Sequence, residues 1–450
     1  MKSRRHEQDE PQSELFKIDL ARIIDPQHEM VRLANAIDWA NFETCFESMW
    51  EDNKGRPAID TRLMVSLHYL KYTFDLSDED VVESWLQNPY WQYLSGMCTF
   101  QHQKPLDPSS MSRWRGRVGK AGLEELLAET LRAGLHLKAV KASQLKRINL
   151  DTTVEEKHIR YPTDSRLYNR SRERLVKVAT KLGINLRQNY NLVGKRLLLQ
   201  QSRYASARQF KRAKRCQKKL HTILGRVIRD IERKAELLLI DPELKELLEI
   251  SRRIHSQRPK DKNKIYSVHA PEVECLSKGK VHKRWEFGVK ASLATTSKGG
   301  WHVGAMSLPG NPYDGHTLTQ CLEQVKRLSP RLPEHIFTDQ GYRGHGHECE
   351  SIQIHVDKKR RGSTPRRLWK WMKRRSAVEP GIGHLKEEHR LNRNRLRGPE
   401  GDMHNVILSA AGMNFHKLLN YLRAFWHWFF GLLSPNFTSC QTEELSATPC

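Results

Sequence analysis

Two short strand-like stretches, each containing an aspartate, lie on either side of a long basic helical stretch. In KRINLDTTV, apolar residues lead into Asp151 and a run of β-branched residues, and in HIFTDQGY an apolar run ends at Asp339. Residues 164–256 have helical spacing and are crowded with arginine and lysine. Strand patterns then resume in RWEFGVKASLATT and WHVGAMSL, and a helical pattern follows in DGHTLTQCLEQVKRL. This order predicts an α/β fold with a mixed sheet, flanking helices and a helical insertion.

The first part of the chain, residues 37–140, is predicted to be an all-helical N-terminal domain. Asp60 can cap a helix with apolar residues every three or four positions, and Ser77 with Asp80 fits a capping box before the next helix. A further helix is expected from Ser109 or the residue after it. Its first turns carry three arginines that could reach DNA as in a helix-turn-helix module, namely Arg113, Arg115 and Arg117. A solvated basic face on a helical bundle explains them equally well.

The remaining boundaries follow from changes in pattern. Residues 1–36 are predicted to be an N-terminal tail, 141–433 the α/β domain, and 434–450 a polar C-terminal tail. An apolar stripe that includes Leu220 and Val227 predicts that the basic insertion at 164–256 is a folded unit.

The charge of the chain points to a polyanionic partner. It has 77 lysines and arginines against 52 aspartates and glutamates, a formal net charge of +25, and nucleic acid is the partner that best matches this excess. An anionic membrane surface would suit the same charge. The longest apolar run, residues 424–433, is about half of the roughly 20 residues needed to span a bilayer, so we expect a core or interface helix and no membrane partner.

Cysteine usage and the N-terminus predict a cytoplasmic location. The eight cysteines include no CxxC pair, which argues against a disulfide framework and a zinc ribbon, and no apolar stretch follows the N-terminal charges. His345, His347 and Cys349 in HGHEC are interpreted as part of a polar loop rather than a zinc site.

Three acids are candidates for a joint role, although each has an ordinary structural explanation. Asp151 could end a strand, Asp339 could be a turn residue, and Glu379 could complete a capping box with Ser376. If the strands with the two aspartates are neighbours, both carboxylates emerge at one edge of the sheet, where a helix could bring Glu379. Such carboxylates repel one another unless cations neutralise them. Two Mg²⁺ ions would do so and could hold the oxygens of a phosphoryl displacement.

Two cations accompany the third acid in RRSAVEPGIGHLK. Arg375 precedes Glu379 by four residues and Lys386 follows it by seven, so a helix would bring all three side chains near one face. They could form an ordinary surface ion pair. Beside a catalytic carboxylate, they would instead be expected to contact the DNA backbone.

The spacing of Arg375, Glu379 and Lys386 resembles the last motif of the DDE transposases of bacterial insertion sequences. That motif is tyrosine, two residues, arginine, three residues, glutamate, six residues, lysine, and Met372 stands here at the tyrosine position. The stretches DTTVEEKHIRYPTD, KGKVHKRWEFGVK, LPGNPYDGHTL and TDQGYRG also resemble this group. The resemblance extends from about residue 37 to residue 420.

This resemblance implies a ribonuclease-H-like core in which Asp151, Asp339 and Glu379 bind two Mg²⁺ ions, for which Mn²⁺ could substitute. It implies cleavage and transfer of DNA strands, with terminal inverted repeats and target DNA as double-stranded partners. A homodimer or larger complex on DNA is expected, because two ends are handled together. Arg343 is a further candidate for a phosphate contact, and Glu286 for a fourth acid.

Two alternatives remain open from the sequence. One is a catalytically silent DNA-binding relic that acts as a repressor, and the other is a metal-dependent nuclease with the same core that cuts without joining. The three acids disfavour the first, because acids at a phosphate site repel DNA.

Overall fold

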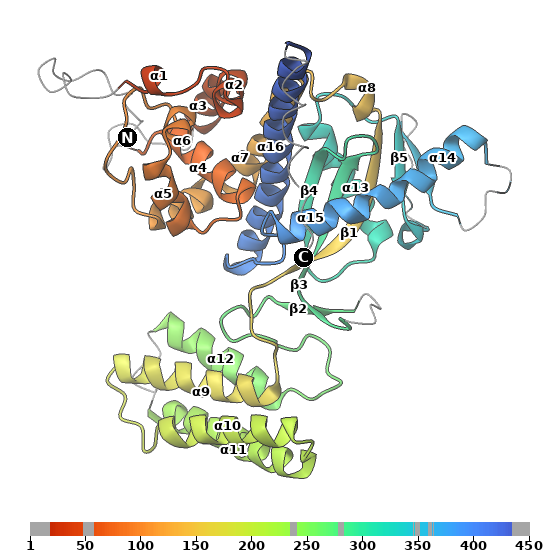
Figure 1. Cartoon of the computed structure of the whole chain (residues 1–450). Helices are drawn as coiled ribbons and strands as arrows, with labels where there is room; N and C mark the ends of the chain where they lie inside the picture. The colour runs from red at the N-terminus through yellow and green to blue at the C-terminus, as the bar shows by residue number, and fades with distance from the viewer. Residues whose placement is uncertain are drawn as a thin grey trace, which may run out of the picture.

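In the computed structural model of the chain, a mixed sheet lies beside a helical layer, and a separate helical bundle lies below both (Figure 1). The structure describes residues 19–47, 58–234, 241–277, 283–344, 346, 352–358, 362 and 364–433. The HGHEC stretch and the predicted C-terminal tail lie outside these residues, apart from Gly346.

The sheet has six strands in the order β2-β3-β1-β5-β6, with β4 also paired to β3. Pairing is antiparallel between β1 and β3 and parallel between β1 and β5, so the predicted mixed sheet is confirmed. The strands are β1 Arg147–Glu156, β2 Glu274–Leu276, β3 Glu286–Thr296, β4 His302–Leu308, β5 His335–Thr338 and β6 Gln353–Val356.

The N-terminal helices begin earlier than the sequence predicted. Leu20 and Leu33 are fully buried in helices that fall within the predicted tail of residues 1–36, because their apolar faces pack into the core. The capping predictions are confirmed at Asp60, whose carboxylate accepts from Leu63 N at 2.9 Å, and at the capping box that opens α5. These helices are α1 Leu20–Ile23, α2 Glu29–Ala36, α3 Trp39–Glu47, α4 Thr61–Thr73, α5 Asp78–Gln87, α6 Pro89–Leu94, α7 Ser109–His136 and α8 Ala142–Leu145.

One long helix, α16 Gly398–Leu433, joins the helical layer to the sheet. It packs against α2, α4, α7 and β4, and Figure 1 shows it running between the two layers. Asn414 links both sides, since its Nδ2 donates to Thr130 Oγ1 at 3.0 Å and to the His302 carbonyl at 2.8 Å. The buried apolar residues of both layers therefore form one cluster, which we call the joint core. Among the described residues, the joint core extends across the predicted boundary near residue 140, which stays a prediction.

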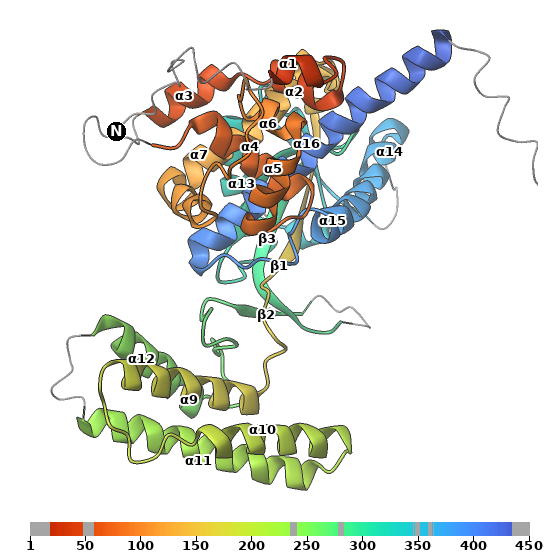
Figure 2. The same cartoon turned by 60° about the vertical axis from the view of Figure 1, so that its left-hand side comes forward.

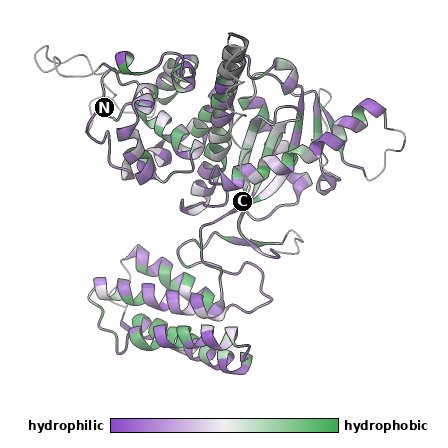
Figure 3. Ribbon diagram, viewed as in Figure 1, coloured by the Kyte–Doolittle hydropathy of each residue, from purple (hydrophilic) through white to green (hydrophobic). Residues whose placement is uncertain are grey.

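The insertion is a bundle with a core of its own, as its apolar stripe predicted. Leu220, Leu224 and Val227 are at most 1% exposed within it, and Figure 3 shows hydrophilic and hydrophobic residues alternating along the helices. Figure 2 shows the bundle away from the rest of the molecule, joined to it by two connecting stretches. Its helices are α9 Asp164–Lys181, α10 Asn191–Ser206, α11 Phe210–Lys234 and α12 Pro242–Ser256.

A buried lysine fixes both connections to the bundle at the ends that are near the sheet. Lys157, directly after β1, lies 2.5 Å from Asp402 Oδ1 on α16 and 3.0 Å from Glu272 Oε1 on the returning connection. The insertion thus leaves the sheet from an anchored position.

The last elements cover the sheet beside the two aspartates. They are α13 Asp314–Leu328, the 3₁₀ helix η3 Gln340–Tyr342, α14 Arg366–Arg374, the 3₁₀ helix η4 Arg375–Ala377 and α15 Val378–Glu387. Among the described residues, no helix has the length and apolar character needed to cross a membrane. The apolar stretch at 424–433 is helical in its backbone, and its predicted packing role lies almost wholly outside the described side chains.

Candidate active site

Asp151 lies in the middle of β1, so it does not end a strand, and Asp339 directly follows the neighbouring parallel strand β5. The ladder between β1 and β5 pairs Ile148 with Ile336 and Asn149 with Phe337. The same offset sets Asp151 opposite Asp339, which follows the last residue of β5 directly. Neighbouring strands are about 4.8 Å apart, so the expected meeting of the two acids at one part of the sheet is supported by the strand register.

Asp339 turns the chain immediately after the strand. Its Oδ1 accepts from Gly341 N at 3.0 Å and so caps η3. A Cβ at Gly341 would lie 2.9 Å from Asp314 Oδ2 and 3.0 Å from Asp339 Oδ1, so the two carboxylates approach the same point of the backbone. A side chain at this position would collide with both.

Asp314, the first residue of α13, is therefore a neighbour of the site. Tyr313 is the residue before α13 and makes no side-chain cap, whereas Asp314 accepts from Lys290 Nζ at 3.0 Å. Tyr342 lies close to the same acids. Its burial, and then the charges of Cys321, Asp314 and Asp151, raise the pKa of the Tyr342 hydroxyl well above its usual value. The hydroxyl stays protonated beside these carboxylates at neutral pH.

Glu379 is exposed in the first turn of α15, in a helical run that continues through η4 from α14. The capping-box interpretation is wrong, because α15 has no side-chain cap and Ser376 Oγ donates to the Lys373 carbonyl at 3.0 Å. The backbone is right-handed at Arg375 and again at Ala377, so the chain turns without interruption. Pro380 is tolerated because N–H groups of a first helical turn lack intrahelical acceptors.

Arg375 connects this helical run to the sheet. Its Nη1 donates to Asp151 Oδ2 at 3.2 Å, and the two side chains are only 13% and 14% exposed. Glu379 follows one helical turn later on the same face, and α15 packs against β1. The structure therefore places the turn that carries the third acid against the strand that carries the first.

Lys386, at the other end of α15, is also directed at an acid of the sheet. Its Nζ lies 3.9 Å from Glu286 Oε1 on β3, and both side chains are largely buried. Glu286 is thus a neighbour of a cation rather than of the two aspartates. In this structure both cations that flank Glu379 are close to protein carboxylates, and their contact with DNA stays a prediction.

The donor set suits a hard divalent cation, because all three predicted ligands are carboxylates. Among the described residues, the potential metal ligands with atoms within 4.8 Å of one another are Glu388, His389 and His416, and the three acids do not form such a group. Like charges repel, and Arg375 holds Asp151 by a hydrogen bond. The three residues fit a metal site by their carboxylate chemistry, and the two aspartates fit it also by the strand register.

One predicted DNA contact is wrong. Arg115 is 2% exposed, and it donates to Asp78 Oδ1 at 2.8 Å and to Asp78 Oδ2 at 2.6 Å. This bidentate pair fixes α7 to α5 inside the joint core, so a phosphate has no access to the guanidinium. Arg113, Arg117 and Arg343 are exposed, and their contact with DNA stays a prediction.

The Met372 position is part of the core. Met372 is 4% exposed, and the neighbouring Trp371 has the Arg147 guanidinium 4.9 Å from its ring centroid. The aromatic ring beside the motif position is therefore covered by a cation of β1.

Two family models match the chain. One, described as a transposase domain (DUF772), matches residues 18–117, and the other, described as a transposase DDE domain, matches residues 253–415. The second range includes Asp339 and Glu379, and most of the helical insertion falls between the two ranges.

A protein of Rhizobium meliloti is also similar. It is described as an uncharacterized protein, ORF8, in the nfe locus, and is 50% identical over 198 residues, which are 44% of this chain and 95% of that relative. No solved structure matches the chain.

Proposed function

We propose that this chain, which belongs to the DDE transposases of insertion sequences, binds the terminal inverted repeats of its own element and joins the cleaved ends to target DNA. As a member of this family it is an enzyme that cleaves and transfers DNA strands. The observation that carries the proposal is the register of β1 and β5, which sets Asp151 opposite Asp339. The Arg375 contact, which brings the Glu379 turn to Asp151, supports it.

The sheet supports assignment to the ribonuclease-H-like fold. A central β1 pairs antiparallel with β3 and parallel with β5. Asp151 lies on β1 just beyond its ladder with β5, and Asp339 directly follows β5. Helices α13 and α15 then bring Asp314 and Glu379 to the same region.

Asp151, Asp339 and Glu379 would hold the divalent ions, for which we propose Mg²⁺ with Mn²⁺ as a substitute. When bound, such ions neutralise charge on the phosphate and activate the attacking oxygen. The protein's own part is to position these acids: Arg375 orients the Asp151 carboxylate, and the Gly341 N–H orients that of Asp339. Positioning and charge neutralisation require no covalent protein intermediate.

Duplex DNA, as terminal repeats and as target, is the proposed partner. The exposed Arg113, Arg117 and Arg343 remain the predicted contacts with phosphates. A dimer or larger complex is proposed because two ends are joined in one event. The protein would act on chromosomal DNA in the bacterial cytoplasm.

The proposal is tested by strand cleavage and joining on a labelled duplex made from the DNA that flanks the gene. The natural protein is compared in Mg²⁺ with Asp339→Asn and Glu379→Gln, and with Glu387→Gln as a matched control on an exposed acid of the same helix. We expect cleaved and joined products from the natural protein and the control. Each of the other variants should lose about 10³-fold or more of the rate while still binding DNA.

The rival functions give different products. Binding without cleavage in either Mg²⁺ or Mn²⁺ would indicate a repressor relic. Cleavage with no joined product would indicate a nuclease.

A further inference from the structure

The charge of the helical insertion is divided very unevenly along its sequence. Residues 164–256 contain 24 arginines and lysines and 9 aspartates and glutamates. None of these acids occurs in residues 174–229, which contain 16 of the cations. This stretch includes all of α10 and most of α11. Helix α10 and residues 210–229 of α11 therefore carry cations and no acids, and the acids of α11, Asp230 and Glu232, lie near its C-terminal end.

The cations of α11 lie on one side of the helix. Its core residues, among them Cys216, Leu220 and Val227, recur at three- and four-residue spacing and are buried. The cations occupy the opposite stripe and are exposed, and they include Lys211, Lys214, Arg215, Lys218, Lys219 and Arg229. At 1.5 Å per residue, the stripe from Lys211 to Arg229 is about 27 Å long. That length corresponds to roughly eight base pairs of duplex DNA.

Protein acids do not neutralise this stripe. The acids of the bundle pair with cations outside this stripe, such as Asp230 with Arg187 at 3.9 Å, Glu232 with Arg252 at 2.7 Å and Glu173 with Arg172 at 3.4 Å. Of the residues that the structure describes, no cation from Lys195 to Arg229 takes part in an ion pair. Uncompensated like charges repel one another, and a bound polyanion would relieve that repulsion.

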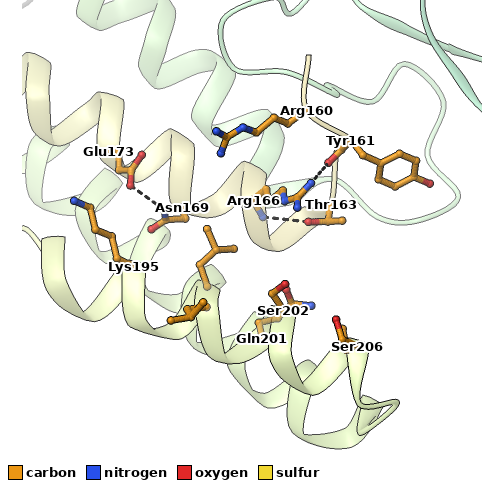
Figure 4. A pocket seen from close by; sticks show the side chains of 13 residues that line it. Arg160, Tyr161, Thr163, Arg166, Asn169, Glu173, Lys195, Gln201, Ser202 and Ser206 are labelled. Atoms are coloured by element: carbon orange, nitrogen blue, oxygen red, sulfur yellow. Dashed lines mark hydrogen bonds between the residues drawn. The ribbon is translucent and has the colours of Figure 1, made fainter. Parts of the chain in front are cut away.

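The cationic pair of helices is remote from the active site. In both Figure 1 and Figure 2, α10 and α11 form the layer of the bundle farther from the sheet, with α9 and α12 nearer to it. A groove of about 540 Å³ separates α10 from the start of α9. Figure 4 shows Arg160, Arg166 and Lys195 along this groove. Cations thus extend from the outer helices to the connection that follows β1.

We propose that α10 and α11 form a second DNA-binding surface, which grips the phosphates of duplex DNA without reading its sequence. This inference rests on the proposed function only in taking DNA as the polyanion. A second copy of the same surface is disfavoured as the occupant, because two stripes of like charge repel each other. The regular cations on a straight helix suit the repeated charge of a duplex backbone.

The test uses the full chain and measures the salt dependence of DNA affinity. Lys214, Arg215, Lys218 and Lys219 are changed together to glutamine, all on exposed positions of α11. The matched control changes four exposed cations of α9 and α12 to glutamine, namely Lys177, Lys181, Lys245 and Arg252. The probe is a fluorescent duplex of unrelated sequence, longer than the α11 stripe, without divalent ions.

We expect the slope of log affinity against log salt concentration to fall in magnitude by about 3 to 4 in the α11 variant. The control should change the slope by less than about 1, although it removes the same net charge. Circular dichroism should show unchanged helix content, because all eight side chains are exposed.

Two outcomes would overturn the proposal. The proposal is wrong if the salt slope of the α11 variant is unchanged. It is also wrong if that variant keeps the slope but loses self-association or the binding of an acidic protein. An equal fall in both variants would show only an effect of net charge.

The same variants separate this proposal from the proposed function. At low salt, where DNA binding is saturated, the α11 variant should cleave at the rate of the natural protein, while Asp339→Asn should keep the natural slope without cleaving. If the natural protein never cleaves DNA but the α11 substitutions still lower the salt slope, the proposed function is refuted and the DNA-binding surface on α10 and α11 is retained.

Discussion

Basic helices of the joint core and of the insertion look alike in sequence but have opposite surroundings. In the joint core, Arg115 is paired with Asp78 and Arg375 with Asp151, and both guanidinium groups are largely buried. On α11 of the insertion, the cations from Lys211 to Arg229 are exposed and form no ion pair among the described residues. Positive charge in a sequence is thus no measure of contact with DNA. Whether a cation is left for DNA depends on whether the tertiary structure brings an acidic side chain of the protein to it.

The largest expected effect that tests this comparison is on stability. Arg115→Gln should lower the free energy of unfolding by about 3–5 kcal/mol, because it leaves the Asp78 carboxylate partly buried without its bidentate partner. Lys214→Gln on α11 should change it by no more than about 0.5 kcal/mol. Urea unfolding followed by circular dichroism measures both. Equal free energies of unfolding for the two variants would contradict the distinction between paired cations in the joint core and exposed cations on α11.

The next effect is on catalysis. Arg375→Gln should lower the rate of strand cleavage by about 10²-fold, because the Asp151 carboxylate loses the group that orients it. Lys373→Gln, on an exposed neighbour, is the control and should cleave normally. Single-turnover cleavage in Mg²⁺ gives the rates. If Arg375→Gln instead lowers the salt slope of DNA binding and leaves cleavage intact, Arg375 is a DNA contact like those proposed on α11.

A smaller effect is expected on the pH dependence of stability. Burial of Asp78 opposes its ionisation, but hydrogen bonds and charges from Arg115 and Lys71 outweigh burial and hold the pKa of the carboxyl well below its usual value. An acid with a lowered folded-state pKa stabilises the protein above its unfolded pKa, near 3.9, and this contribution disappears as pH falls further.

The measurement is the urea midpoint of the natural protein and of Asp78→Asn at a series of pH values. The natural protein should lose more stability than the variant as pH falls below about 4. Parallel curves for the two proteins would contradict the assigned role of the Asp78 charge.

The smallest effect concerns a single cation of α11. Arg229→Gln should reduce the magnitude of the salt slope by about 1, with no change in unfolding free energy beyond about 0.5 kcal/mol. Arg253→Gln on α12 is the matched control and should leave the slope unchanged. Fluorescence anisotropy with the duplex of unrelated sequence measures both slopes.

Several features of the site were accessible from local sequence. The strands around Asp151 and Asp339 and the helix around Glu379 form as their patterns predicted, because each pattern is set by neighbours within one element. The caps at Asp60 and Ser77 follow for the same reason. The position of Asp314 was not accessible in this way, since the pattern YDGHTL does not show that α13 begins beside Asp339.

Long-range pairing was not accessible in this way. The partner of Arg115 is 37 residues away, and that of Arg375 is 224 residues away. The shared core of the helical layer and the sheet was likewise not accessible, because α16, at the other end of the chain, fills the space between them.

By itself, the sequence determined the types of the elements, the three acids, the folded insertion and the family to which the chain belongs. Those properties depend on periodicity, capping and motif spacing, which are local. Only the tertiary structure decided which cations are neutralised and which are left for a partner. That outcome depends on which distant side chains meet, and burial makes an unpaired charge costly where an exposed one is tolerated.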